Sequence, residues 1–306
     1  MVPESVPPGS LRLLTVHAHP DDESSKGAAT MAAYAHAGVD VMVATCTGGE
    51  QGSILNSALA SEPRAQRDLP GLRREEMADA AAALGITQRW LGFADSGLPE
   101  GDPPPDLHEH SFAMMPLERA AAPLVRLVRR FRPHVIVGYD ENGGYPHPDH
   151  IMAHRVTVEA YHAAGDPDRY PGTGRPWAPA KLYYDRAFNP ARFQAMHDVL
   201  EERGIESPFA EWIARRMQTD AEGNPPPGLT HETTTRIHCA DWFQVRDTAL
   251  KCHRSQVAPD GFFFAVGLDL QREVWPWEEY TLIDARVPTD LPETDLFAGI
   301  EPDRAS

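Results

Sequence analysis

The stretch LRLLTVHAHPDDE, residues 11–23, joins a short apolar run to a cluster of histidine and acidic side chains. Residues 11–17 are mostly Leu, Thr and Val, a composition typical of a buried β-strand. Ser24 and Ser25 come next, and they can cap a helix over the alanine-rich residues 28–37. The stretch therefore predicts a strand, a polar turn and a helix, which together begin a βαβ unit.

The same alternation of strand and helix continues to about residue 164. Further strands are predicted at 39–46, 89–92 and 134–139, and further helices at 72–84, 116–131 and 149–164. This order predicts a Rossmann-like α/β fold with a mostly parallel sheet and helices on both faces. Beyond residue 164 the pattern loosens, with predicted strands at 181–188 and 233–238 and predicted helices at 192–203 and 240–255.

We expect three parts along the chain: a flexible tail at 1–10, a metal-binding catalytic core at 11–170, and a C-terminal extension at 171–306. The extension is predicted to contain helices and strands and to frame the substrate site. The N-terminus lacks the basic and apolar regions of a secretion signal. No run approaches the roughly 20 apolar residues that a membrane-spanning helix needs, and we expect a cytoplasmic protein without membrane contact.

Composition narrows the classes of partner. The 306 residues contain 28 basic and 45 acidic side chains, which gives a net charge of −17. That charge argues against binding to nucleic acid or to anionic lipid, and favours a small-molecule substrate. The three cysteines, Cys46, Cys239 and Cys252, form no CxxC pair, so a four-thiolate zinc site is excluded and a reducing compartment is favoured.

Two clusters of histidine and aspartate follow predicted strands, HAHPDDE at 17–23 and YDENGGYPHPDH at 139–150. In an open α/β sheet, ligands bind beyond the carboxyl ends of the strands. His19 and Asp22 are three residues apart across a turn and can converge on one ion, and His150 most naturally supplies a third ligand. Two imidazoles, one carboxylate and an open position are the features of a catalytic zinc site.

Other interpretations of these clusters remain open. Asp22 can also act only as a helix cap. His154 shares the helix face of His150 and is an alternative ligand, although a supporting role is favoured. His17 alternates away from His19 along the strand and is predicted to be buried structure.

The aspartate beside the predicted ligands favours hydrolysis. Non-haem iron oxygenases use the same ligand types, but they do not need a free carboxylate such as Asp21. A free Asp21 can take a proton from a metal-activated water and return it to a leaving amine. The sequence also lacks GxSxG, P-loop, GxGxxG and HExxH motifs, which removes several common enzyme classes.

With HPDDE and HPDH in this order, the chain resembles the LmbE-like zinc deacetylases, the family that includes N-acetylglucosaminyl-phosphatidylinositol de-N-acetylases. TGGEQGSILN at 47–56, WLGFADSGLPEGD at 90–102 and ETDLFAGIEP at 293–302 strengthen the resemblance. It extends over residues 11–302 and is greatest to the branch that cleaves mycothiol S-conjugates. The resemblance implies that His19, Asp22 and His150 bind one Zn²⁺ per subunit, with Fe²⁺ as an alternative metal.

The same resemblance implies roles for residues around the metal. Asp21 matches the general base, His147 the imidazole that steadies the oxyanion, and Asp149 the carboxylate that orients or tunes it. Tyr145 matches a mobile tyrosine whose hydroxyl polarises the amide carbonyl.

Residues from other segments match positions that grip the sugar in this family. Glu50, Arg73 and Asp95 fall where relatives hold the glucosaminyl-inositol hydroxyls. For Arg73, which has Glu75 and Glu76 nearby in sequence, a plain surface ion pair is the alternative.

Lys26 is one of only three lysines and stands just past the metal motif. The resemblance implies that it contacts the acyl, cysteinyl side of the scissile amide. The implied reaction is hydrolysis of a mycothiol S-conjugate to a mercapturic acid and glucosaminyl-inositol, in thiol-based detoxification. The alternatives are deacetylation of N-acetylglucosaminyl-inositol and a metal-holding, non-catalytic sugar-binding protein. Residues 262–264, three phenylalanines, are predicted to pack in a core, with a wall of the substrate site as the alternative.

Overall fold

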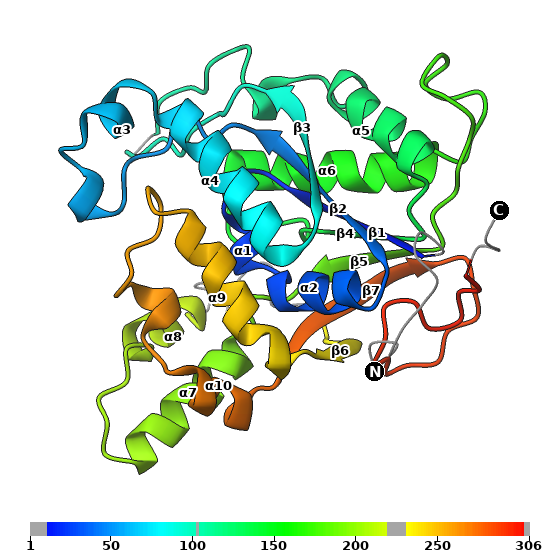
Figure 1. Cartoon of the computed structure of the whole chain (residues 1–306). Helices are drawn as coiled ribbons and strands as arrows, with labels where there is room; N and C mark the ends of the chain where they lie inside the picture. Colours follow the sequence, from blue (N-terminus) through cyan, green and yellow to red (C-terminus); the bar gives the residue numbers. More distant parts are fainter. Residues whose placement is uncertain (1–10, 102–103, 219–230, 303–306) are drawn as a thin grey trace.

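One mixed sheet organises the chain in the computed structural model, which describes residues 11–101, 104–218 and 231–302. Within these residues the sheet has seven strands in the order β3-β2-β1-β4-β5-β7-β6 (Figure 1). The strands are β1 (Arg12–His17), β2 (Asp40–Thr47), β3 (Thr87–Phe93), β4 (Val135–Gly138), β5 (Lys181–Asp185), β6 (Thr235–His238) and β7 (Trp277–Ala285). The predicted tail at 1–10 lies outside the described residues.

The first five strands run parallel, as the alternating sequence pattern predicts. β1 pairs with β2 and β4, and the outer pairs β2–β3 and β4–β5 are also parallel. β7 runs antiparallel to both β5 and β6. The predicted mostly parallel α/β sheet is therefore confirmed, and the later strands β5, β7 and β6 continue it. The division of the chain at residue 170 stays a prediction.

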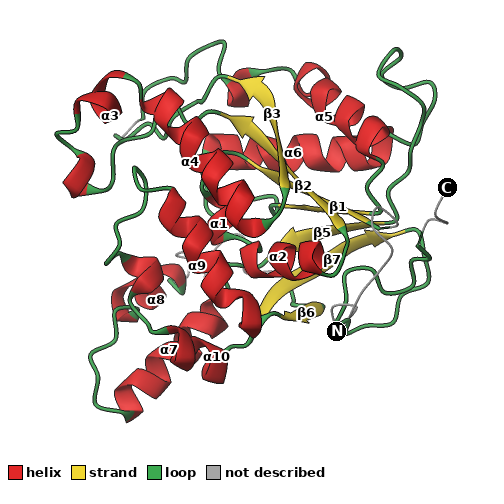
Figure 2. Cartoon of the chain, viewed as in Figure 1, coloured by secondary structure: helices red, strands yellow, loops and turns green. Residues whose placement is uncertain are grey.

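Helices cover both faces of the sheet (Figure 2). Successive residues of β1 point to opposite faces of the sheet. Leu13 packs in a core with residues of α2, α4 and α9, whereas Leu14 packs with residues of α5 and α6. These helices are α2 (Ala28–His36), α4 (Leu69–Leu84), α5 (Leu117–Phe131), α6 (Pro148–Ala163) and α9 (Phe243–Cys252). Buried on both faces, the central strands need the apolar runs that the sequence provides.

A smaller group of helices lies beside β7 and β6, at the lower left of Figure 1. It contains α7 (Pro190–Glu202), α8 (Ala210–Arg216) and α10 (Leu268–Val274). Phe193, Met196 and Phe209 form the centre of a separate apolar cluster there, against which Phe262 packs. The two remaining α-helices of the described residues are the short α1 (Asp22–Ser25) and α3 (Pro63–Arg67).

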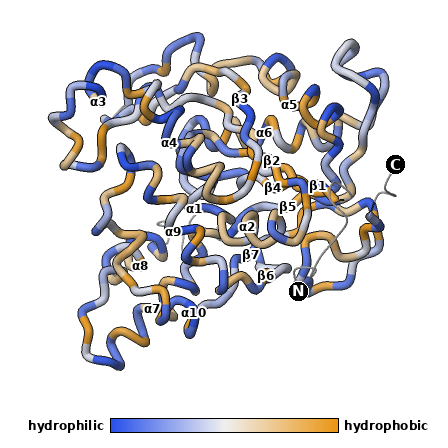
Figure 3. The backbone as a smooth tube through the Cα atoms, in the orientation of Figure 1, coloured by the Kyte–Doolittle hydropathy of each residue, from blue (hydrophilic) through white to orange (hydrophobic). Residues whose placement is uncertain are grey.

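Hydropathy follows this architecture. Figure 3 shows hydrophobic residues gathered along the central strands β1, β2 and β4. No helix among the described residues combines the length and the apolar character that crossing a bilayer demands.

Arg129 of α5 joins the end of α6 to the loop that follows it. The buried guanidinium donates to the carbonyl oxygens of Ala163 and Ala164 at the end of α6. It also donates to the carbonyls of Asp166, Arg169 and Tyr170 and to the hydroxyl of Thr173. One side chain thus satisfies several carbonyl groups that the end of a helix leaves without partners.

Replacing Arg129 with methionine is expected to lower the free energy of unfolding by about 3 kcal/mol, because buried carbonyls lose their donors. Urea denaturation of the variant and the wild type measures this difference. Arg130→Met, at the neighbouring exposed position, is the matched control and should change stability by less than about 0.5 kcal/mol. Equal effects of the two substitutions would contradict a special role for Arg129.

Candidate active site

The two predicted clusters meet because β1 and β4 are adjacent parallel strands. β1 ends at His17, and the HPDD turn follows; β4 ends at Gly138, and the loop after it leads to His147, which caps the N-terminus of α6. The backbone N–H of Ala18 donates to the hydroxyl of Tyr139 at 3.0 Å and ties the two segments together. The site therefore lies at the carboxyl edge of the sheet.

The structure brings the three predicted metal ligands together. His19 Nδ1 and His150 Nε2 lie 3.5 Å and 3.4 Å from the same oxygen of Asp22. All three side chains are buried, and their ligand atoms lie within 4.8 Å of one another. Their donor types and convergence fit a divalent cation.

The hydrogen bonding of His150 leaves one of its nitrogens available to an ion. Nδ1 lies 2.9 Å from the carbonyl oxygen of Gly143 and therefore carries the proton. Nε2 is then a free lone pair, buried and without a hydrogen-bond partner among the residues that the structure describes. Burial holds the pKa of His150 well below its usual value, which favours the neutral ring that binds metals.

Lys26 neutralises the carboxylate of Asp22, a predicted ligand, rather than extending into solvent. Its buried ammonium donates to Asp22 Oδ1 at 2.5 Å and to the hydroxyl of Ser25 at 3.2 Å. Burial opposes the ionised form of Asp22, but Lys26, His150 and His19 together hold its pKa well below the usual range. The predicted contact of Lys26 with the acyl side of a substrate stays a prediction.

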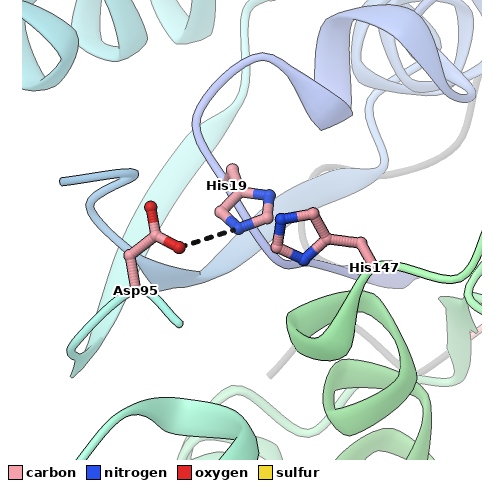
Figure 4. Close-up of side chains that lie close together, drawn as sticks. All are labelled: His19, Asp95 and His147. Carbon is pink, nitrogen blue, oxygen red and sulfur yellow. Dashed lines mark ion pairs between the residues drawn. The ribbon is translucent and has the colours of Figure 1, made fainter. Parts of the chain in front are cut away.

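A second donor set shares His19. Figure 4 shows the His19 ring between Asp95, which follows β3, and His147, which precedes α6. His19 Nε2 lies 3.6 Å from Asp95 Oδ1, and the ligand atoms of these three buried residues also lie within 4.8 Å of one another. Sequence analysis did not predict Asp95 as a candidate ligand, because its place in the chain resembled a sugar contact.

Asp149 contacts the predicted ligand His19 through its carboxylate. Its Oδ2 lies 3.2 Å from His19 Nε2 and accepts from the backbone N–H of Ser96 at 2.9 Å. Towards His147 it offers only its backbone N–H, which donates to Nδ1 at 3.1 Å. Burial alone would lower the pKa of His19, but Asp149, Asp22 and Asp95 raise it well above its usual value. A carboxylate on the second nitrogen of a histidine is the usual way to orient a metal ligand.

Asp21, the predicted general base, lies beside the ligands without sharing their contacts. Its side chain is 26% exposed and lies 3.4 Å from the guanidinium of Arg73. Its φ of 115° is in the left-handed region, which non-glycine residues rarely adopt. Burial raises the pKa of Asp21, and the charge of Arg73 opposes that rise.

The strained backbone at Asp21 is held by a buried pair. Glu23 accepts from the backbone N–H of Asp21 at 3.0 Å through one oxygen, and its other oxygen lies 2.7 Å from His253 Nε2. Both side chains of the pair are fully buried, and although burial opposes it, His253 lowers the pKa of Glu23 to about 2. Sequence analysis missed this pair, because His253 lies 230 residues from Glu23.

Arg73 is not a surface residue, so the alternative of a plain surface ion pair is wrong. The buried guanidinium donates to the carbonyls of Gly49 and Pro20 at 2.9 Å and 2.7 Å. A Cβ at Gly49 would lie 2.1 Å from Arg73 Nη1. A larger residue at position 49 would therefore clash with the guanidinium in its present place. Glu50 next to it is exposed, and accepts from the backbone N–H of Asp95 at 3.2 Å.

Tyr145, His154 and His17 lie in three different environments around the two donor sets. The ring of Tyr145 is 36% exposed, and its centroid lies 4.6 Å from that of His150, so it stands at the mouth of the site. His154 lies outside both donor sets, with Nδ1 3.0 Å from the carbonyl of Tyr139. His17 is buried, as predicted, and burial lowers its pKa to about 4.

Asp185 is a further residue that was not predicted from the sequence. It ends β5 at the same edge of the sheet, so the rule that found His19 and His150 also applies to it. Burial raises its pKa from 3.8 to about 6, although Lys26 opposes the rise. The folded protein therefore binds this proton more tightly than the unfolded chain does, and an ionised Asp185 destabilises the fold above about pH 6 but not below about pH 4.

Asp185→Asn should therefore raise the free energy of unfolding by about 2 kcal/mol at pH 8 and by only a few tenths at pH 4. Denaturant titrations at several pH values measure the difference between variant and wild type. Asp290→Asn, at an exposed position, is the control and should give a difference that does not change with pH. A pH-independent effect of Asp185→Asn would show that the carboxylate is not destabilised by burial.

Known proteins that are similar to this chain include an amidase and several deacetylases. Residues 14–161 match the protein family described as GlcNAc-PI de-N-acetylase. A mycothiol S-conjugate amidase of Streptomyces coelicolor is 51% identical over 95% of this chain and 97% of its own length. A 1D-myo-inositol 2-acetamido-2-deoxy-alpha-D-glucopyranoside deacetylase of Frankia alni is 41% identical over 93% of this chain and 99% of its own.

Solved structures show the same fold at low sequence identity. An N,N'-diacetylchitobiose deacetylase of Pyrococcus horikoshii aligns with 89% of this chain and 83% of its own, at a TM-score of 0.58 and 16% identity. A deacetylase from the biosynthesis pathway of teicoplanin aligns with 89% of this chain and 96% of its own, at a TM-score of 0.55 and 18% identity.

Proposed function

We propose that this chain, which belongs to the GlcNAc-PI de-N-acetylase family, is a zinc-dependent amidase acting on mycothiol S-conjugates. The products are a mercapturic acid and glucosaminyl-inositol, and the reaction serves thiol-based detoxification in the cytoplasm. The observation that best supports this proposal is the buried donor set of His19, Asp22 and His150. Asp21 lies beside this set, partly exposed and outside it. The relative from Streptomyces coelicolor supports the choice of substrate.

Proton transfer in this proposal depends on Asp21. When bound, zinc or Fe²⁺ supplies a Lewis acid that makes water acidic near neutral pH. Asp21 accepts a proton from the attacking water and returns it to the nitrogen of the departing amine. Arg73 and the Glu23–His253 pair hold Asp21 in place from two sides, through its carboxylate and through its backbone N–H.

His147 and Tyr145 act on the oxygen of the scissile amide. Because His147 Nδ1 accepts from the backbone N–H of Asp149, the proton of the neutral ring resides on Nε2. Nε2 can therefore donate to the oxyanion, and such donors contribute about 2.7–4 kcal/mol each. The partly exposed Tyr145 supplies a second donor from the mouth of the site.

In this proposal, the sugar of the substrate binds on the side of the metal centre where β2 and β3 end. Glu50 and Asp95 follow these strands, and Arg73 lies beneath the loop after β2. Because Arg73 and Asp95 are buried in contacts with backbone groups, we assign them the shaping of the sugar site and assign direct contact to the exposed Glu50.

Turnover of two substrates side by side tests the proposal. We expect a bimane conjugate of mycothiol to be hydrolysed with a kcat/KM at least about tenfold above that of N-acetylglucosaminyl-inositol. The relative from Frankia alni supports the acetyl sugar as the alternative substrate, and a preference for that sugar would overturn the amidase assignment. Absence of turnover on both, with retained metal, would favour a non-catalytic sugar-binding protein. Metal analysis of the purified protein decides between zinc and iron.

A further inference from the structure

A second hollow at the same sheet edge has no part in the chemistry described above. It contains about 890 Å³ of space free of protein atoms, its mouth included. Its walls come from β7, from the segment after β5 and from the helices beside β7 and β6. Eight of its lining side chains are aromatic: Phe188, Phe193, Phe209, Phe262, Phe263, Trp275, Trp277 and Tyr280. We call this hollow the aromatic cavity.

The aromatic cavity adjoins the metal centre. Ser24, Ser25 and Gly27, which flank Lys26 directly after the predicted ligands, form part of its wall. The ammonium of Lys26 lies 2.5 Å from Asp22 Oδ1 on one side and 5.4 Å from the ring centroid of Phe188 on the other. One buried side chain thus separates a ligand carboxylate from the aromatic lining.

The residues assigned to the sugar and the aromatic cavity lie on opposite sides of the predicted metal centre along the strand order. His19 and His150 follow the neighbouring strands β1 and β4. The residues assigned to the sugar follow β2 and β3 on one side, whereas the aromatic cavity lies beyond β5 and β7 on the other. A scissile amide at the metal with its amine towards the sugar site therefore directs its acyl group towards the aromatic cavity.

We propose that the aromatic cavity binds the S-substituent of the conjugate and selects apolar, aromatic substituents. This inference rests on the proposed function. In a cysteine S-conjugate, three single bonds separate the scissile carbonyl carbon from sulfur, roughly 4 Å in all. A group on that sulfur then extends away from the metal centre on the side of Phe188, whose ring centroid lies 5.4 Å from the Lys26 ammonium. Aromatic rings that pack together gain more than their buried area alone provides.

Arg192 gives the aromatic cavity a polar feature as well. Arg192 lines the cavity, and its guanidinium lies 5.7 Å from the ring centroid of Phe193, without a hydrogen bond or ion pair in the described part of the chain. Arg246, which also lines the cavity, is instead engaged by Asp247 and Gln271. A guanidinium that packs against an aromatic wall and keeps its N–H donors available favours electron-rich rings and substituents that carry a carbonyl group.

Two conjugates of mycothiol that differ only on sulfur test the inference, one with an S-(1-naphthylmethyl) group and one with S-methyl. Phe262→Ala should lower kcat/KM for the naphthylmethyl conjugate about tenfold and leave the S-methyl conjugate within about twofold. Val266→Phe, which fills the same cavity, should produce the same selective loss. Ile205→Ala, at an exposed position of the same region, is the control and should alter neither value. Equal losses on both conjugates in Phe262→Ala and Val266→Phe would overturn the inference.

A binding measurement keeps the inference separate from the proposed function. N-acetyl-S-(1-naphthylmethyl)cysteine should change the tryptophan fluorescence of the wild type, and Trp275→Phe with Trp277→Phe should abolish that change. Trp90→Phe, in β3 at the far edge of the sheet, should retain it. A change that survives loss of Trp275 and Trp277 would overturn the cavity assignment. If neither conjugate is hydrolysed, the proposed function fails, and this fluorescence result alone decides whether the cavity binds such groups.

Discussion

Asp21→Asn is expected to lower kcat by about 10³-fold while leaving the bound metal and the fold in place. Asparagine has nearly the same shape as aspartate, but its amide cannot take a proton from water or return one to an amine. Asp21 coordinates nothing in the predicted ligand set, and its backbone N–H remains bonded to Glu23 in the variant. Steady-state hydrolysis of a mycothiol conjugate, with metal content and thermal unfolding measured on the same preparation, gives the result.

Asp40→Asn, at the exposed start of β2, is the control for Asp21→Asn and should keep full activity. Loss of metal from Asp21→Asn would identify this residue as a ligand instead of a base. Activity within about threefold of the wild type would place the general base elsewhere.

His150→Ala is expected to weaken zinc binding by about 10³-fold, because it removes one of three protein ligands from a site of high total affinity. Because the variant loses the metal, its rate of hydrolysis should fall below detection. Metal analysis after dialysis, together with calorimetric titration of zinc into the metal-free protein, measures the loss. His154→Ala, one turn further along α6, is the matched control and should bind zinc as the wild type does.

The same titration decides between the two donor sets that share His19. If the ion occupies His19, Asp22 and His150, then Asp95→Ala retains zinc. If it occupies His19, Asp95 and His147, then Asp95→Ala loses zinc and His150→Ala retains it, which would contradict the predicted ligand set.

Three central strands of the parallel part of the sheet could be predicted from sequence because they are buried on both faces. β1, β2 and β4 are continuous apolar runs, and each ends within two residues of its prediction. β7 was not predicted, because its sequence WEEYTLIDA carries acidic side chains among apolar ones. Two of these acids have tertiary roles: Glu278 accepts from the backbone of α2, and Glu279 pairs with Arg236. Such partners cannot be found from local pattern.

The candidate site shows the same limit. His19, Asp22 and His150 could be found because each follows a strand end, where the fold itself gathers side chains. Lys26 and Asp22, which form an ion pair, are only four residues apart in the sequence. The sequence alone could nevertheless not show whether the ammonium points inward or towards solvent. The contact between Glu23 and His253 depends on where α9 packs, which no short motif encodes.

The continuation of the sheet by β5, β7 and β6 has a consequence for attempts to isolate the first half of the chain. A fragment that stops at residue 170 would leave β4 as an outer strand, with the main-chain groups that pair with β5 unsatisfied. An apolar outer strand of this kind is a template for pairing with another molecule, and it promotes aggregation. The fragment would also lose Glu278, whose carboxylate accepts from the backbone at the start of α2, directly after the turn that carries two of the predicted ligands. The residues proposed to perform the chemistry thus lie in two short segments of the first half, but the solubility and shape of their scaffold depend on the whole chain.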